Sequence, residues 1–326
     1  MNCLIIGAGQ LGSRHLQSLL KFKLERLNIF ILDTSTESIG MAKSRAAEIS
    51  HSHNIEYSLD WNNIPTQLFF VVVATNSKVR EGITLKLLSD FNVKVLILEK
   101  VLFPNIDSYV KVGQVLRSSG TICYVNHARR MFKGYKILKC RIEKEHGLHF
   151  QVIGSNWGLA CNGLHYLDLI EYLTGSKLET VNTDFVEDEI LQSKRSGYIE
   201  FAGLISGNLS NGNTFTIGSL NSSNITAPAI SIMGAGFRAT VHENGCDPSI
   251  YFFEQESNFS LEKMPLKIPF QSELTSIALS DFLTNGSISL TPFVDAAQCH
   301  KVFLSSLLSH YNNLSNISNN KLLPIT

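Results

Sequence analysis

Residues 7–15 read GAGQLGSRH and follow a short apolar run, CLIIG, at the start of the chain. The amphipathic stretch LGSRHLQSLLKF comes next, so the glycines lie between an expected buried strand and an expected helix. In that context Gly7 allows a tight turn, Gly9 lets the backbone approach a pyrophosphate, and Gly12 lets the helix pack closely on the strand. The helix N-terminus would supply N–H groups for the phosphates. The motif therefore predicts a dinucleotide-binding turn, although glycines at this spacing alone would be weak evidence.

Asp33 closes the next apolar run, NIFILD, where a carboxylate can accept hydrogen bonds from the hydroxyls of the adenosine ribose. Its charge would repel a 2′-phosphate, so the sequence favours NAD over NADP as the cofactor, with NADP still possible. The purely structural alternative is a glycine turn with Asp33 as a capping residue. The residues expected to contact the cofactor are Gly7, Gly9, Gln10, Leu11, Gly12, Asp33, Thr75, Asn76, Glu99 and Lys100.

The first part of the chain alternates apolar runs with helical patterns, from CLIIG through NIFILD, LFFVVVAT and VKVLILEK to TICYVN. Continuous apolar runs of this length are typical of strands that are buried on both faces, as in a parallel sheet. The helical stretches between them would form the crossovers. We therefore predict an α/β fold that opens with a Rossmann domain, a doubly wound parallel sheet, over residues 1–122.

Beyond residue 122 the pattern changes to a helix near 162–174 and then to polar alternating stretches such as GNTFTIGSLNSS and APAISIMGAGFRATVHENG. Alternation with Gly and Asn turns indicates antiparallel strands with one wetter face. Two more helices are expected, near 272–283 and 292–311, the second with Thr291 as N-cap and Pro292 in its first turn. Residues 123–326 should thus form an α+β domain with a largely antiparallel open sheet, for substrate binding and oligomerisation. The tail SNNKLLPIT is expected to be loosely held.

The charge balance is even, with 28 Lys and Arg against 28 Asp and Glu in 326 residues. No large field favours nucleic acid or an anionic membrane, so neither is an expected partner. The start MNCLIIGAG has no basic leader and no membrane-length apolar run, which predicts a cytoplasmic protein. The cysteines are scattered and the pair His51 and His53 lies in a polar loop that we interpret as surface, so no metal site is expected.

Several segments together resemble the Gfo/Idh/MocA oxidoreductase family, over nearly the whole chain. GAGQLGSRH resembles the glycine loop of that family, and VVVATNSKVR resembles its strand-Thr-Pro segment, with Asn76 where proline is usual and Arg80 where histidine is common. LILEKVLF resembles its Glu-Lys-Pro motif, with Glu99 and Lys100 kept and Val101 in place of proline. WGLACNGLHYLDLIEYLTG resembles the segment with Gly-x-His and an apolar helix.

The resemblance implies catalytic roles for Lys100 and His165. Lys100 ends a parallel strand, at the edge where ligands bind, and its ammonium could stabilise a developing alkoxide as hydride moves to the nicotinamide, with Glu99 holding it in place. His165 would exchange the proton of the reacting hydroxyl, and Asp168, one helical turn on, could orient its ring. The alternatives are a strand-end ion pair for Lys100 and an ordinary core histidine for His165.

One position departs from the family pattern, which commonly has an acid four residues before this histidine. That position is Cys161, and a thiol near its normal pKa cannot replace a carboxylate at neutral pH. Arg129 and Arg130 could clamp a carboxylate or phosphate, or one of them could tie the two domains together. The residues expected to bind substrate are Lys100, Asn126, Arg129, Arg130, Cys161, Asn162 and His165.

The resemblance implies an NAD(P)-dependent oxidoreductase that acts on a secondary alcohol or ketone of a sugar, sugar nucleotide or cyclitol, in carbohydrate metabolism or the synthesis of a surface sugar. Two alternatives stay open: a reductase for C=N or other carbonyl compounds, and a catalytically silent dinucleotide-binding sensor or partner protein. Strands between Gly212 and Asn244 should present a broad, partly apolar sheet face, which predicts a homodimer or homotetramer.

Overall fold

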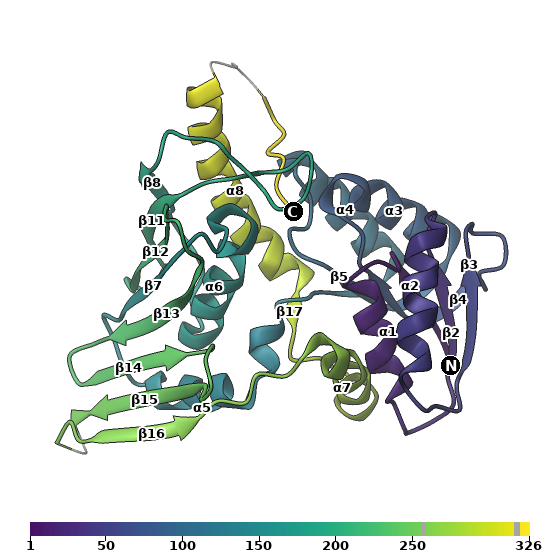
Figure 1. Ribbon diagram of the computed structural model, residues 1–326, viewed down its shortest axis with the longest axis horizontal. Coiled ribbons are helices and arrows are strands. Elements are labelled where there is room, and N and C mark those ends of the chain that lie inside the picture. The colour runs from purple at the N-terminus through teal and green to yellow at the C-terminus, as the bar shows by residue number, and fades with distance from the viewer. Residues whose placement is uncertain (256–257, 316–319) are drawn as a thin grey trace. The chain divides into compact units, whose positions relative to one another are not determined.

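The computed structural model describes residues 1–255, 258–315 and 320–326, and it divides into two compact units (Figure 1). The first unit comprises Met1–Phe103, Asp107–Ala128 and Pro269–Asp295, and the second comprises Pro104–Ile106, Arg129–Ile268 and Ala296–Thr326. The division differs from the boundary expected after residue 122. Two pieces of chain explain the difference, because the strand at Ile122–Val125 and the returning segment Pro269–Asp295 both pack within the first unit.

The first unit contains a sheet with the strand order β17-β6-β5-β4-β1-β2-β3. Its strands are β1 (Asn2–Ile6), β2 (Asn28–Leu32), β3 (Asn54–Ser58), β4 (Gln67–Val73), β5 (Asn92–Leu98), β6 (Ile122–Val125) and β17 (Thr291–Pro292). All pairings are parallel except that of β17 with β6. The chain adds β2 and β3 on one side of β1 and then β4, β5 and β6 on the other side. The carboxyl ends of β1 and β4 are therefore the switch point of a Rossmann fold, as the sequence predicts.

Helices connect these strands: α1 (Gly12–Leu20), α2 (Thr36–Ala47), α3 (Ser77–Asp90) and α4 (Ile106–Ser119), with α7 (Gln271–Asn285) packed along α1 (Figure 1). The central strands are buried on both faces, since Leu4, Ile5, Val71 and Val72 are all fully inaccessible. The continuous apolar runs therefore indicated the parallel sheet correctly.

The second unit is built on a sheet with the order β16-β15-β14-β13-β7-β12-β11-β8 and a two-stranded ribbon, β9 with β10. The strands are β7 (His149–Ser155), β8 (Asn182–Val186), β9 (Leu191–Gln192), β10 (Ile199–Glu200), β11 (Gly203–Asn208), β12 (Thr214–Leu220), β13 (Thr226–Met233), β14 (Phe237–His242), β15 (Ser249–Glu254) and β16 (Leu261–Pro265). Only the pairing of β7 with β12 is parallel among the described strands of this sheet. The predicted mostly antiparallel sheet is confirmed.

The second unit also contains the short helix η1 (Ala128–Met131) and the helices α5 (Lys133–Ile142), α6 (Leu159–Thr174) and most of α8 (Phe293–Ser315). One sheet face is buried, with Phe150, Ile217 and Ile232 at 1 % exposure or less, while outward residues such as Met233 stay accessible. The predicted α+β organisation is therefore found.

Thr291 and Pro292 are not the N-cap and first turn of the last helix, contrary to expectation. They form β17 and pair with Val125 and Tyr124 of β6, and α8 begins at Phe293. The fully buried Thr291 joins the edge of the sheet. The edge pairing thus outweighs the local preference of proline for a helix start.

Two further expectations about the surface are wrong. The tail is not loosely held over residues 320–326, because Leu323 and Ile325 are fully buried and the Leu323 amide donates to the Pro104 carbonyl at 3.0 Å. Residues 316–319 lie outside the described part. His53 is also buried, and its ring accepts from the Leu27 amide and donates to the Phe22 carbonyl. Burial lowers its pKa, and no cluster of metal ligands occurs among the described residues.

Candidate functional site

The glycine loop between β1 and α1 has a geometry that larger residues would not permit. Gly7 has a φ of +93°, and a Cβ atom there would lie 3.0 Å from the main chain at Ala74 and Thr75. A Cβ atom at Gly12 would lie 1.7 Å from the Gly7 carbonyl oxygen, whereas one at Gly9 would meet nothing closer than 3.9 Å. Two glycines therefore close the turn, and the third leaves open space above the loop.

That open space lies at the first turn of α1, where the N-cap residue Leu11 makes no side-chain capping bond. A helix N-terminus of this kind offers amide donors to an anion. The loop is braced from α2, since Arg45 donates to the Gln10 carbonyl at 2.7 Å, to the Gln10 side chain at 2.5 Å and to Ser13 Oγ at 2.6 Å. The residues present thus fit the pyrophosphate of a dinucleotide.

Asp33 follows β2, and its carboxylate accepts two main-chain hydrogen bonds. Oδ2 accepts from the Ala8 amide at 2.7 Å and Oδ1 accepts from the Ser35 amide at 2.8 Å. Ser35 in turn caps α2 by accepting from the Ser38 amide. Asp33 therefore stabilises the glycine loop itself, in addition to any contact with a ribose.

Thr75 and Asn76 follow β4 at the same edge of the sheet. Asn76 is the N-cap residue of α3 but makes no side-chain capping bond there. The Thr75 hydroxyl is buried and has no hydrogen-bond partner within the described part of the chain. An unsatisfied buried hydroxyl beside the glycine loop is a further feature that a bound nucleotide could satisfy.

Lys100 follows β5, is partly exposed, and has anchored residues on both sides. Before it, Glu99 is buried and accepts from His15 Nε2 at 3.0 Å and from Asn126 Nδ2 at 2.5 Å. After it, the buried Arg80 of α3 donates to the carbonyls of Val101 and Leu102, and also to that of Thr75. The Lys100–Val101 peptide bond is cis.

Burial opposes the charge of Glu99, but the hydrogen bond and the electrostatic effect of His15, the hydrogen bond from Asn126 and the charge of Arg80 hold the pKa of Glu99 below its usual value. A carboxylate in this site therefore stays ionised at neutral pH. Of these partners the sequence analysis named Asn126, as an expected substrate contact, and Arg80, but it assigned no role to His15.

In the second unit α6 carries Cys161, Asn162 and His165. Gly158, with a φ of +87°, precedes α6, and the side-chain Nδ2 of Asn162 donates to the Trp157 carbonyl at 2.8 Å. Cys161 is buried and His165 is partly exposed. Cys161 and Asn162 lie in the first turn of α6, and His165 lies about one turn further along the helix.

The first turn of α6 holds a carboxylate that comes from β10. Glu200 accepts from the amides of Ala160 and Cys161 and from that of Phe201, while a Cβ atom at Gly158 would lie 2.8 Å from its Oε2. Burial raises the pKa of Glu200, although these hydrogen bonds oppose the shift. An acid is therefore present beside Cys161, even though α6 itself lacks one there.

Arg129 and Arg130 are both compensated by carboxylates of the second unit. Arg129 pairs with Glu243 through bonds of 2.7 and 2.6 Å, and Arg130 pairs with Asp168 through bonds of 2.8 and 2.7 Å. Tyr166 adds a hydroxyl contact and a ring face to Arg129. These two forked ion pairs give Arg129 and Arg130 a structural role. That either arginine binds a carboxylate or phosphate of a substrate stays a prediction.

The predicted residues divide between the units. The cofactor candidates and Asn126 belong to the first unit, where they follow the carboxyl ends of β1, β2, β4, β5 and β6. Arg129, Arg130, Cys161, Asn162 and His165 belong to the second. Sequence reasoning missed His15, Arg45 and Glu200. His15 lay inside the quoted motif, but Glu200 has no local signal because it reaches α6 from a distant strand.

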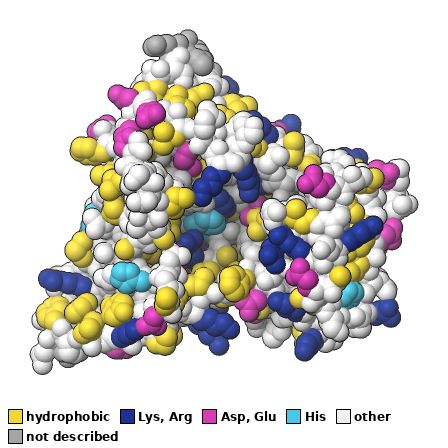
Figure 2. Space-filling model, viewed as in Figure 1, with side chains coloured by type: hydrophobic (Ala, Val, Ile, Leu, Met, Phe, Trp, Pro, Cys, Tyr) yellow, Lys and Arg dark blue, Asp and Glu magenta, His cyan; other side chains and the backbone are white. Residues whose placement is uncertain are grey.

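The surface agrees with the balanced composition, since basic and acidic side chains both occur over the visible face (Figure 2). Among the described helices, none has the length and apolar character needed to cross a membrane.

Comparisons with known proteins identify the first unit. Residues 1–127 match the family model GFO_IDH_MocA, described as an oxidoreductase family with an NAD-binding Rossmann fold. No curated protein sequence matches the chain.

Solved structures match over almost the whole chain. UDP-N-acetylglucosamine 3-dehydrogenase GnnA from Acidithiobacillus ferrooxidans has a TM-score of 0.72 at 14% identity, covering 96% of this chain and 99% of that one. Myo-inositol 2-dehydrogenase from Lactobacillus plantarum has a TM-score of 0.67 at 16% identity, covering 96% and 98%. The transcriptional regulator Gal80p from Kluyveromyces lactis has a TM-score of 0.72 at 12% identity, covering 96% and 92%. At these identities the likeness is one of fold.

Proposed function

Because residues 1–127 are a domain of the Gfo/Idh/MocA oxidoreductase family, we propose that the chain is an NAD-dependent oxidoreductase for a secondary alcohol or ketone of a sugar, sugar nucleotide or cyclitol. The similarity in fold to a sugar-nucleotide dehydrogenase and an inositol dehydrogenase supports this substrate class. The proposal includes carbohydrate metabolism as the setting.

One observation carries the proposal, namely the anchoring of Lys100 at the switch point. A partly exposed ammonium follows β5, while the residues on either side are fixed by His15 and Asn126 at Glu99 and by Arg80 at Val101. Groups held in this way need little reorganisation when charge develops on a substrate oxygen.

The residues of the loop are suited to NAD. Gly9 and the first turn of α1 would hold the pyrophosphate, and Asp33 would accept from the ribose hydroxyls. Bound NAD supplies the nicotinamide that accepts or returns a hydride. Lys100 then stabilises the substrate oxygen, and His165 takes or returns the proton of the hydroxyl at its imidazole.

Turnover with a panel of sugars, sugar nucleotides and cyclitols, followed by NADH absorbance, tests the proposal. Lys100→Met should lower kcat by about a hundredfold and leave NADH binding nearly intact, because only the charge that meets the reacting oxygen is lost. Lys94→Met, at an exposed position of the same strand, is the matched control and should keep full activity. His165→Asn should also lower kcat by about a hundredfold. A fully active Lys100→Met enzyme would contradict the assigned role.

A catalytically silent dinucleotide-binding protein is the second candidate. Two observations favour it: Cys161 where an acid is common, and a fold similar to that of the regulator Gal80p. This alternative predicts NADH binding without turnover of any panel member, so the same experiment separates the two.

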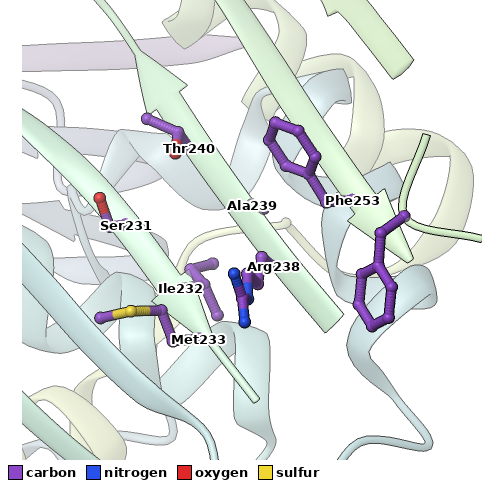
Figure 3. Close-up of a pocket in the computed structure, with 8 residues that line it drawn as sticks. Ser231, Ile232, Met233, Arg238, Ala239, Thr240 and Phe253 are labelled. Atoms are coloured by element: carbon purple, nitrogen blue, oxygen red, sulfur yellow. The ribbon is translucent and has the colours of Figure 1, made fainter. Parts of the chain in front are cut away.

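We also propose that the chain forms a homodimer or homotetramer through the outer face of the second unit's sheet. The face is hollowed where β13, β14 and β15 run side by side, with a volume of about 370 Å³ (Figure 3). Met233, Arg238 and Phe253 lie in one row across these strands, since Arg238 pairs in register with both of the others. A second copy of the chain would cover this partly apolar surface.

A further inference from the structure

A buried hydrogen-bond network lies directly beside Lys100 in the first unit. Its members come from α1, the ends of β5 and β6, and α7. They are His15, Glu99, Asn126, Gln271 and Thr275. Among them His15, Glu99, Asn126 and Thr275 are between 1 and 6% exposed. The function proposed above uses His15 and Asn126 only to fix Glu99, and it gives Gln271 and Thr275 no role.

The donors and acceptors of this network fix one another. Glu99 can only accept, so Asn126 must turn its amide nitrogen toward it, at 2.5 Å. The same nitrogen donates to Gln271 Oε1 at 2.9 Å, so the Gln271 nitrogen faces the other way. It lies 3.2 Å from Thr275 Oγ1 and 3.3 Å from His15 Nδ1.

The Glu99 contact fixes one proton of His15. Nε2 lies 3.0 Å from Glu99 Oε1, and because the carboxylate can only accept, Nε2 carries a proton and donates it to Glu99. Nδ1 lies 2.8 Å from Thr275 Oγ1, whose hydroxyl can donate or accept. His15 thus holds Glu99 with one N–H.

We propose that His15 is a positioning residue that couples the glycine loop to Lys100. His15 lies in the first turn of α1, three residues after Gly12, and it holds the Glu99 carboxylate, whose main chain leads directly into Lys100. Arg80 fixes the far side of Lys100 at the carbonyls of Val101 and Leu102. The first turn of α1 is therefore joined to the residue before Lys100 by the hydrogen bond from His15 to Glu99, and a displacement of the glycine loop on cofactor binding would reach Lys100 through it. The inference rests on the proposed function for the role of Lys100.

Steady-state kinetics and NADH titration test the coupling. His15→Leu should lower kcat by about tenfold or more, with the Kd for NADH changed by about twofold at most, because Lys100 loses its position while the loop remains. His15→Gln should recover much of the loss, because its amide can again donate to Glu99. Ser18→Ala is the matched control, since it removes the contacts of Ser18 on α1 with the amide and the hydroxyl of Ser276 on α7, at 2.9 and 3.2 Å, and leaves Glu99 untouched. Equal losses in Ser18→Ala and His15→Leu would overturn the inference in favour of helix packing alone.

Two measurements decide the matter without any turnover. Nitrogen NMR of histidine-labelled protein should show the signal of His15, assigned by its loss in His15→Gln, with a proton on Nε2 at neutral pH. Hydrogen exchange of residues 98–102 should accelerate about tenfold or more in His15→Leu and not in Ser18→Ala. An unprotonated Nε2, or unchanged exchange in His15→Leu, would overturn the coupling. Absence of turnover with normal results here would instead count against the proposed function.

Discussion

The Asp33 carboxylate binds the main chain of the glycine loop as well as being the candidate for ribose recognition. Its two oxygens accept from the amides of Ala8 and Ser35, so part of its hydrogen-bonding capacity is already used. Each carboxylate oxygen can accept a second bond, which leaves room for a ribose hydroxyl. A substitution that removes the whole side chain would therefore disturb the loop and the cofactor contact together.

Asp33→Asn separates these two effects better than Asp33→Ala does. The amide keeps the size and one acceptor oxygen but removes the charge, so repulsion of a 2′-phosphate should weaken. We expect NADH to bind more tightly than NADPH in the wild type, and the ratio of the two Kd values to shrink by about tenfold, or about 1.4 kcal/mol, in Asp33→Asn. Fluorescence titration with both cofactors measures the ratio.

Ser35→Ala is the control for that experiment, because it removes the α2 cap beside Asp33 without changing charge. It should weaken both cofactors to a similar degree and leave the ratio unchanged. Equal affinity for NADH and NADPH in the wild type would show that the placement of Asp33 against the ribose is wrong.

Helix α6 carries Cys161 at the position where the family pattern commonly has an acid, and Glu200 from β10 lies beside it. The Cys161 amide donates to Glu200 at 3.2 Å, so a carboxylate introduced at position 161 would meet one that is already buried there. Like charges at one helix end repel each other unless one of them is protonated. We therefore expect that Cys161→Asp alone does not restore a charged acid at position 161.

We expect Cys161→Ser to keep most of the activity, because the hydroxyl group is nearly as large as the thiol and is a stronger hydrogen-bond donor. Cys161→Asp should lower the free energy of unfolding by about 1 to 3 kcal/mol at neutral pH, with a smaller loss in acid. The double variant Cys161→Asp/Glu200→Gln should recover much of the loss, because one charge is removed. Denaturant unfolding of the wild type, Cys161→Asp, Glu200→Gln and the double variant measures this coupling. Loss of turnover in Cys161→Ser with normal NADH binding would instead make the thiol itself catalytic.

Glu171, in the C-terminal part of α6, makes the free energy of unfolding depend on pH. Burial raises its pKa from 4.5 to about 7, although the Leu178 amide donates to Oε1 and opposes the shift. Between these two values the folded chain keeps a proton that the unfolded chain has released. The contribution of Glu171 to the free energy of unfolding is therefore fully present below about pH 4.5 and is lost as the pH rises through about 7.

Glu171→Gln should remove that dependence. The variant should be more stable than the wild type by up to about 3 kcal/mol above pH 7, and the difference should vanish near pH 4.5. Denaturant unfolding from pH 4 to pH 9 measures it, with Glu189→Gln at an exposed site as the control. A constant difference across the whole pH range would show that Glu171 does not titrate in this way.

The sequence predicted those elements whose signal is local. The glycine loop, the apolar strands and α6 each carry their pattern in adjacent residues, and the structure confirms them. β17 and Glu200 could not be found in this way, because the first depends on pairing with β6 and the second on packing against α6. The buried tail is a similar case, since its short apolar run LLPIT is stabilised by contacts with Pro104 and Ile199.

At the scale of the whole molecule, the chain passes more than once between its two units. Segment Pro269–Asp295 returns to the first unit and places α7 along α1, and the chain then ends in the second unit. A composition shift marks a single boundary, so the pattern along the sequence predicted two consecutive domains. The return became visible only through contacts such as that of Ser18 with Ser276.

The outer face of the second unit's sheet leads to a prediction about assembly. Met233 is 43% exposed there and lies beside Arg238 and Phe253 in the hollow that Figure 3 shows. If a second copy covers this face, a charge at Met233 would be buried without a partner and would cost several kcal/mol per interface. We expect light scattering to show a dimer or tetramer for the wild type at micromolar concentration and mostly monomer for Met233→Lys. Ile137→Lys, at a 44% exposed position on α5, adds the same charge elsewhere and should leave the assembly unchanged. A wild-type monomer, or equal dissociation by both variants, would mean that this face is not the interface.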